Sequence, residues 1–166
     1  MILAEDRRHQ NFVAAYLKRR KYEGEIRRES LPSGRGCGEQ WVRENYARAV
    51  GAYRARSKKI RTALIVVIDA DKGDTERRTR QLREALPSNP RQSGEAIVHF
   101  IPRRHIETWV LHLTGEQVEE TSDYHNRDVD RLISSAAASF HEWTSQPPAG
   151  CLPSISAAIQ ETKRLG

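Results

Sequence analysis

Residues 62–74 read TALIVVIDADKGD, and this stretch decides the fold. The run from Thr62 to Ile68 carries no charge, is rich in Val and Ile, and does not alternate between apolar and polar positions. It is too short to span a membrane, so it predicts a strand buried on both faces, as in a parallel sheet. Asp69 and Asp71 then lie at the C-terminal end of that strand, where open α/β sheets bind ligands.

These two aspartates are candidate metal ligands. Residues two apart in a strand share a face, so Asp69 and Asp71 converge if the strand stays extended this far. Two unpaired carboxylates repel each other and resist desolvation, whereas a divalent cation stabilises both, and Mg²⁺ prefers oxygen ligands. The alternative is a solvated, Asp-rich loop that begins the next helix. The position of the pair after the most apolar strand of the chain favours the metal site.

Composition and length predict one cytoplasmic domain. A chain of 166 residues with 37% hydrophobic and 30% charged residues is long enough for a single core. It contains no run of about 18 apolar residues, and its first ten residues, MILAEDRRHQ, are too charged for a signal peptide. We therefore expect no membrane partner. Cys37 and Cys151 are far apart and lack metal-ligand spacing, so neither a zinc site nor a disulfide is expected.

The net charge of +6 is distributed unevenly. Residues 1–61 carry 16 Lys and Arg against 7 Asp and Glu, whereas residues 105–166 carry 4 against 9. A basic half on a small domain is typical of proteins that bind polyanions such as nucleic acid. The alternative is an Arg-rich, solvated surface without a ligand.

The rest of the chain alternates between apolar segments of strand length and amphipathic segments of helical period. Strands are predicted at residues 1–4, 25–31, 62–68 and 96–101, and helices at residues 7–20, 39–57, 75–86, 106–113, 128–140 and 154–165. This order predicts an α/β fold, with a mostly parallel sheet of about four strands flanked by helices. Residues 1–115 form the predicted core, and residues 116–166 form a helical C-terminal extension of the same domain.

A second group of reactive side chains follows the apolar segment 96–101. Arg103, Arg104, His105 and Glu107 lie just beyond its C-terminal end, as Glu5 lies just beyond the first strand. Taken alone, Glu107 is equally consistent with a first-turn acid stabilised by the helix dipole, and His105 with a polar loop residue.

A Glu that ends the first strand and a DxD that ends a later apolar strand resemble the topoisomerase-primase (TOPRIM) domain, over about the first 110 residues. The resemblance implies that Glu5, Asp69 and Asp71 bind Mg²⁺, or Mn²⁺, for cleavage of nucleic-acid phosphodiesters. Glu107 is similar to a further acid that helps hold a second metal in nucleases of the overcoming-lysogenization-defect group. The chain is also similar to small TOPRIM-like proteins of bacterial anti-phage modules, which implies a partner ATPase.

The chain departs from those nucleases at two positions. His9 stands where they often have another Glu, one helical turn after the first, and their later catalytic lysine has no counterpart, because Lys72 comes too early and Lys163 is remote. The resemblance therefore implies one Mg²⁺ rather than a complete two-metal site.

The expected activity is metal-dependent cleavage of a nucleic acid. The catalytic candidates are Glu5, Asp69, Asp71, Glu107 and His105, with His105 or His9 as general acid or base. The candidates for contact with phosphates are Arg7, Arg8, Arg35, Arg43, Arg48, Arg54, Lys72, Arg103 and Arg104. Two alternatives remain open: a non-catalytic module that binds nucleic acid or protein and retains a vestigial acidic site, and a phosphotransfer domain with a phosphoaspartate.

Overall fold

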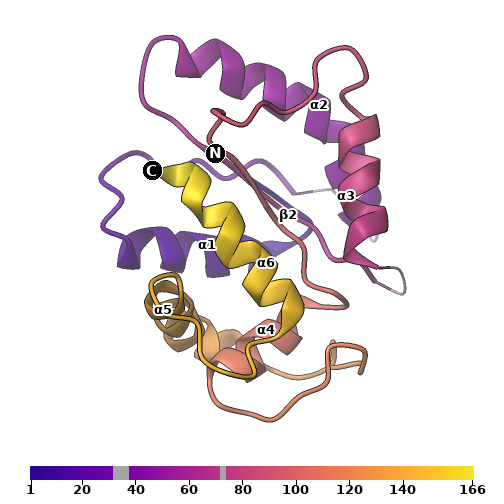
Figure 1. The fold of residues 1–166 in the computed structure, drawn as a ribbon, viewed down its shortest axis with the longest axis vertical. Coiled ribbons are helices and arrows are strands. Elements are labelled where there is room, and N and C mark those ends of the chain that lie inside the picture. Colours follow the sequence, from indigo (N-terminus) through magenta and orange to yellow (C-terminus); the bar gives the residue numbers. More distant parts are fainter. Residues whose placement is uncertain (32–37, 72–73) are drawn as a thin grey trace.

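Three parallel strands form the centre of the computed structural model, which describes residues 1–31, 38–71 and 74–166 (Figure 1). The strands are β1 (Ile2–Ala4), β2 (Leu64–Val67) and β3 (Ile97–Phe100), and β2 lies between the other two. Every residue of the three strands is buried, as is Ile68 directly after β2. The apolar run of residues 62–68 is therefore the central strand, as its composition predicts.

The register brings the C-terminal ends of the strands to one edge of the sheet. Ala4 lies opposite Val67, and Val67 lies opposite Phe100. The pairing continues beyond the assigned strands, because Ile68 N–H donates to the Phe100 carbonyl at 3.1 Å and Ala70 N–H donates to the Pro102 carbonyl at 2.8 Å. The segments that follow all three strands therefore meet at this edge.

Helices cover both faces of the sheet (Figure 1). They are α1 (Arg7–Arg19), α2 (Gly38–Ser57), α3 (Thr75–Glu84), α4 (Ile106–Leu113), α5 (Ile133–Trp143) and α6 (Pro153–Thr162), with 3-10 turns η1 (Asp130–Leu132) and η2 (Lys163–Leu165). Strand side chains alternate between faces. Leu3, Leu64 and Val66 pack with α2 and α3, whereas Ile65 and Val67 pack with α1, α4, α5 and α6.

An aromatic cluster holds the C-terminal helices to the sheet. The Phe140 ring of α5 lies 5.1 Å from Tyr16 of α1, 5.4 Å from Phe100 of β3 and 6.1 Å from Trp109 of α4, measured between ring centroids. Aromatic pairs at these separations add to the hydrophobic gain of burial. Residues 116–166 therefore share a core with the N-terminal part of the chain.

The sheet has three strands in the described part of the chain, one fewer than the sequence predicts. Residues 25–31 run along the outer edge of β1, where Ile2 N–H donates to the Arg27 carbonyl at 2.8 Å and Glu29 N–H donates to the Ile2 carbonyl at 2.9 Å. Only a single parallel bridge, between Ile2 and Arg28, forms there. The segment is mostly charged and buries little apolar surface, so it does not extend as a strand.

The outer edge of β3 is covered by side chains. His99 N–H donates to Glu161 Oε2 of α6 at 3.0 Å, and the Ile97 carbonyl accepts from Arg91 Nη1 at 3.0 Å. Arg91 and Glu161 also pair with each other. Among the described helices, none is long and apolar enough to cross a membrane.

Candidate functional site

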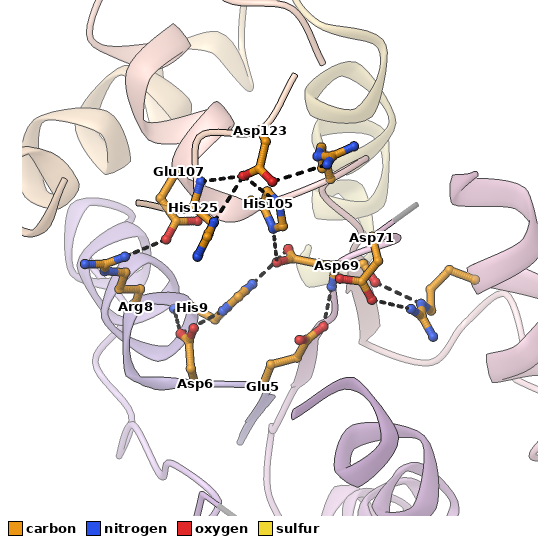
Figure 2. Close-up of polar contacts among 12 residues, drawn as sticks. Glu5, Asp6, Arg8, His9, Asp69, Asp71, His105, Glu107, Asp123 and His125 are labelled. Carbon is orange, nitrogen blue, oxygen red and sulfur yellow. Dashed lines mark hydrogen bonds and ion pairs between the residues drawn. The ribbon is translucent and has the colours of Figure 1, made fainter. Parts of the chain in front are cut away.

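Glu5 and Asp69 are neighbours at the C-terminal edge of the sheet (Figure 2). Glu5 follows β1 directly, and Asp69 lies two residues after β2. Because Ala4 pairs with Val67, the two acids come together, and Asp69 N–H donates to Glu5 Oε1 at 2.5 Å. The parallel register is therefore the reason that acids 64 positions apart in the sequence share one site.

Asp71 does not share the direction of Asp69. The extended backbone ends at Ala70, and Asp71 has a left-handed conformation with φ of +56°, which aspartate tolerates better than most residues. Its Oδ2 lies 3.2 Å from Arg78 Nη2 of α3, whereas Asp69 points toward His9 of α1 (Figure 2). The two aspartates therefore do not converge on one face of an extended strand, as the sequence predicts, because the backbone turns at Asp71.

Arg78 is a buried cation that connects the site to two helices. Its Nε donates to the Asp69 carbonyl at 2.9 Å, and its Nη1 donates to Glu39 Oε2 of α2 at 2.7 Å and to Gln81 Oε1 at 2.9 Å. With the contact to Asp71, the guanidinium group is engaged on every side. Its planar, forked donors suit this bridging position, so Arg78 holds the loop after β2 in place.

His9 lies between two carboxylates. Its Nδ1 is 2.8 Å from Asp6 Oδ1 and its Nε2 is 2.9 Å from Asp69 Oδ1, with only 2% of the residue exposed. Both ring nitrogens can donate only when the imidazole is protonated. Burial alone would lower the pKa of His9, but the Asp69 charge and the bonds to both acids raise it well above its ordinary value. His9 is therefore protonated and places a positive charge beside Asp69.

Asp6 is positioned by the start of α1. It is the N-cap residue, and its carboxylate accepts from His9 N–H at 3.0 Å as well as contacting the imidazole ring. Burial opposes ionisation of Asp6, yet these bonds from His9 lower its pKa to about 2. Hydrogen bonds thus connect three charged side chains, Asp6, His9 and Asp69, from the N-terminus of α1 to the carboxylate site.

His105 approaches Asp69 from the other side of the site. Its Nδ1 lies 3.8 Å from Asp69 Oδ2 and its Nε2 lies 3.4 Å from Asp123 Oδ1. Asp123 also contacts His125 Nδ1 at 3.2 Å and Arg104 Nη2 at 3.2 Å. The Asp69 carboxylate raises the pKa of His105 above its ordinary value, despite partial burial. A proton carrier is thus available within reach of the carboxylates.

Glu107 is bound by an arginine rather than directed at the other acids. Its Oε1 accepts from Arg8 Nη1 at 2.6 Å (Figure 2). Arg8 Nε also donates to Asp130 Oδ1 at 2.9 Å. The Glu107 side chain is 8% exposed, so this ion pair joins α1 to α4 in a partly buried position. The first-turn acid of α4 therefore has a structural partner of its own.

Glu5 resists ionisation beside Asp69 and Asp71 at the edge of the sheet. Burial, and then the nearby Asp69 charge, raises the pKa of Glu5 to about 8, against an ordinary value near 4.5. Burial and the same neighbour also raise the pKa of Asp71, although Arg78 opposes the change. His9 therefore does not fully compensate the three carboxylates. Additional positive charge at this point would be favourable.

The chemistry of these side chains fits a hard divalent cation, because Glu5, Asp69 and Asp71 supply oxygen donors and a cation would compensate the charge that Glu5 gains on ionisation. Their arrangement is not that of a complete ligand set. Within residues 1–31, 38–71 and 74–166, no three His, Cys, Asp or Glu side chains form a group that could hold a metal ion. Asp69 is bound to His9, Asp71 to Arg78, and Glu107 to Arg8.

The arginines of α2 are paired with carboxylates. Arg43 lies 2.6 Å from Glu39, Arg48 lies 3.2 Å from Glu29, and Arg54 lies 2.5 Å from Glu95. Arg54 also donates to two carbonyls of the loop before β3. The basic helix that the sequence predicts exists, but a phosphate would compete with these acids for its arginines.

The other candidate phosphate ligands differ in their surroundings. Arg8 and Arg104 are in the ion pairs described above, whereas Arg7 and Arg103 are exposed. Arg35 and Lys72 lie outside the described residues.

A hollow of about 500 Å³ opens beside the carboxylates. Its walls are formed by residues from α2, α3, the ends of β2 and β3, and the loop after α4: Glu39, Ala70, Asp71, Asp74, Arg77, Arg78, Gln81, Arg104, His105 and Asp123. Among the described residues, its wall carries three arginines and four acids. It is large enough for a phosphate group and an adjoining sugar or base.

Several residues of the site, among them Asp6, Arg78 and Asp123, were not among the candidates from the sequence. Asp6 could have been found, because an Asp directly before a helical pattern is an N-cap signal. Arg78 and Asp123 carried no such signal, since one is among four arginines in α3 and the other lies in an irregular loop.

The chain matches no family model, curated protein or solved structure at a significant level.

Proposed function

We propose that the chain is a TOPRIM-like nuclease that cleaves nucleic-acid phosphodiesters with Mg²⁺ or Mn²⁺. The observation that carries the proposal is the contact between Glu5 and Asp69, whose 2.5 Å bond joins the ends of adjacent parallel strands. Burial, and then the Asp69 charge, raises the pKa of Glu5 to about 8, so added positive charge would favour its ionisation. A divalent cation is the ligand that would supply it.

Glu5, Asp69 and Asp71 would hold the cation, which would polarise the phosphoryl oxygen and acidify a bound water. The chain's own residues contribute orientation and protons. His9 fixes the Asp69 carboxylate through the 2.9 Å bond from Nε2. His105, whose pKa is raised, can hold a proton near the reacting group and donate it to the leaving oxygen.

One observation favours the alternative of a non-catalytic module with a vestigial acidic site. Asp69 and Asp71 already have cationic partners, His9 and Arg78, within 2.9 Å and 3.2 Å. A site whose acids are neutralised by the protein itself has less need of a metal. Metal binding is therefore the property that separates the two functions.

Metal binding should release a proton that comes from Glu5. At pH 7 a carboxyl group with a pKa of about 8 is mostly protonated, and it must ionise to bind a cation. We expect about one proton released per Mn²⁺ or Mg²⁺ at pH 7 and close to none at pH 9.5. Calorimetric titration in two buffers of different ionisation enthalpy measures this number.

The matched control is Glu5→Gln, which should abolish proton release and weaken metal binding at both pH values. Absence of any metal-binding heat in the unaltered protein would favour the non-catalytic module. Proton release that is equal at pH 7 and pH 9.5 would exclude Glu5 as its source.

We further propose that the protein acts in the cytoplasm as the effector of an anti-phage system, together with a partner ATPase. The acidic composition of residues 105–166 supports a protein partner, because complementary charge guides association with a basic surface. The proposal rests on the family resemblance for the nature of that partner.

Partner dependence predicts weak or no cleavage by the isolated chain. Purification alone and with the product of the neighbouring gene, followed by cleavage assays and size-exclusion chromatography, measures the difference. We expect co-elution and at least a roughly tenfold higher rate for the pair, about the factor that 1.4 kcal/mol provides. Strong cleavage by the pure chain, unchanged by the neighbour, would contradict partner dependence.

A further inference from the structure

Helix α3 displays three arginines along one side. Arg77, Arg80 and Arg83 are spaced by three residues and are exposed to solvent. Within the part of the chain that the structure describes, no ion pair or hydrogen bond engages their side chains. The fourth arginine of the helix, Arg78, is buried in the site. Three unpaired guanidinium groups on one short helix form a concentrated positive surface.

This surface differs from the basic face of α2. The α2 arginines Arg43, Arg48 and Arg54 contact carboxylates at 3.2 Å or less, so their charge is largely compensated. A phosphate that binds there must displace an existing partner, whereas one that binds to α3 displaces no carboxylate of the described residues. Guanidinium groups that are free to turn can make bidentate contacts with phosphate oxygens.

The helix also separates two hollows. The hollow beside the carboxylates, of about 500 Å³, has Arg77 in its wall and reaches Asp71. A second hollow, of about 520 Å³, lies between α3 and α6 and has Arg80 and Arg83 in its wall. Successive positions three apart turn gradually around a helix, so the arginines cross α3 from one hollow to the other. In Figure 1, α3 lies at the side of the molecule.

The second hollow is suited to a polar, anionic ligand. Arg80 and Arg83 supply its positive charge, and the Thr75 hydroxyl is a potential donor, whereas the hydroxyls of Thr79 and Ser154 already donate to the Thr75 carbonyl and to Glu120. Glu76 and Glu161 also line it, but Glu161 is already bound to Arg91.

We propose that Arg77, Arg80 and Arg83 bind the phosphate backbone of a nucleic-acid strand and lead it along α3 to the carboxylate site. The proposal rests on the proposed function for the identity of the polyanion. The three residues span about 9 Å along the helix axis at 1.5 Å per residue, enough for contacts to two or three successive phosphates. Backbone contacts of this kind position a strand without reading its sequence.

The test compares two triple variants in the full chain. The first is Arg77→Gln with Arg80→Gln and Arg83→Gln. The control is Arg19→Gln with Lys58→Gln and Lys59→Gln, which removes the same charge from exposed positions toward the opposite edge of the sheet. Glutamine preserves helix propensity, and thermal unfolding checks that both variants fold.

Binding is measured by fluorescence anisotropy with labelled single-stranded DNA, duplex DNA and single-stranded RNA, in EDTA and over a salt series. The α3 variant should bind at least about tenfold more weakly at 0.1 M salt. The slope of log K against log salt should fall by about 1.4 to 2 on a single strand, because each of the two or three phosphates that the protein neutralises there contributes roughly 0.7. The control variant should change the slope by less than half as much.

Several outcomes would overturn the proposal: equal weakening in the two variants, no weakening in the α3 variant, or no binding by the unaltered protein at low salt. A third triple variant, Arg43→Gln with Arg48→Gln and Arg54→Gln, tests the basic face of α2 directly. If it alone fails to bind, the polyanion surface lies on α2 instead.

The test is independent of cleavage, because EDTA removes the metal. If the α3 arginines bind nucleic acid but neither the chain nor its complex cleaves with any metal, this inference is supported and the proposed function fails. If cleavage occurs and the α3 variant binds and cleaves normally, the proposed function stands and this inference fails.

Discussion

Replacing Asp69 by Asn should reduce metal-dependent cleavage at least about 100-fold, because it removes the central carboxylate of the site. Even outer partners of metal ligands commonly contribute 10- to 100-fold, so removal of a ligand should cost no less. Asp69 lies between Glu5 and His9, with bonds of 2.5 Å from its backbone and 2.9 Å to its side chain. A cleavage assay with Mg²⁺ or Mn²⁺, and EDTA as the blank, measures the effect.

Loss of fold must be separated from loss of chemistry in this variant. Asp69→Asn leaves buried His9 with one charged partner, Asp6, so stability should also fall. Asp71→Asn is a second test of the metal site, since its side chain is 46% exposed and its replacement disturbs the core less. We expect at least about a tenfold reduction from Asp71→Asn without unfolding. Undiminished cleavage in either variant would remove that residue from the metal site.

Replacing Glu5 by Gln should stabilise the metal-free protein at high pH. The pKa of Glu5 is about 8 in the folded state against about 4.5 ordinarily, so folding opposes its ionisation. Its contribution is fully present below pH 4.5 and is lost as the pH rises toward and past 8. The neutral amide avoids this loss. A shift of this size corresponds to a gain of about 2–4 kcal/mol at pH 9.

Urea unfolding in EDTA at pH 4, 7 and 9 measures this dependence. The difference between Glu5→Gln and the unaltered protein should be near zero at pH 4 and largest at pH 9. Glu23→Gln, at an exposed position in the turn after α1, is the control and should show no trend. A difference that is constant from pH 4 to 9 would show that folding does not oppose the ionisation of Glu5.

The fold could be predicted largely because its central strand is unambiguous. The apolar run ending at Ile68 and the alternation of strands and helices around it predict an α/β fold. The structure confirms this fold, with a parallel sheet and C-terminal helices. The sequence pattern of residues 25–31 could not show that this segment forms a single bridge and not a strand. Whether it forms depends on how much apolar surface an edge segment buries, which is a property of the assembled sheet.

The site was predictable only where it follows from strand register. Glu5 and Asp69 meet because each ends one of two neighbouring parallel strands. The separate direction of Asp71 arises from one backbone angle, which the pattern DAD does not specify. Which arginines lack an acidic partner likewise depends on the folded structure and not on the local sequence. Arg54 pairs with Glu95, 41 positions away, whereas Arg80 has no acidic partner among the described residues.

The covered edge of β3 limits how any other protein can attach to this sheet. A partner that adds a strand must find unpaired backbone donors and acceptors. Glu161 and Arg91 already occupy the outward N–H of His99 and carbonyl of Ile97. A neighbouring chain would have to break both bonds before β-augmentation could begin. Assembly with a partner on this side must therefore proceed through helix surfaces and side chains, which also protects the sheet edge from aggregation.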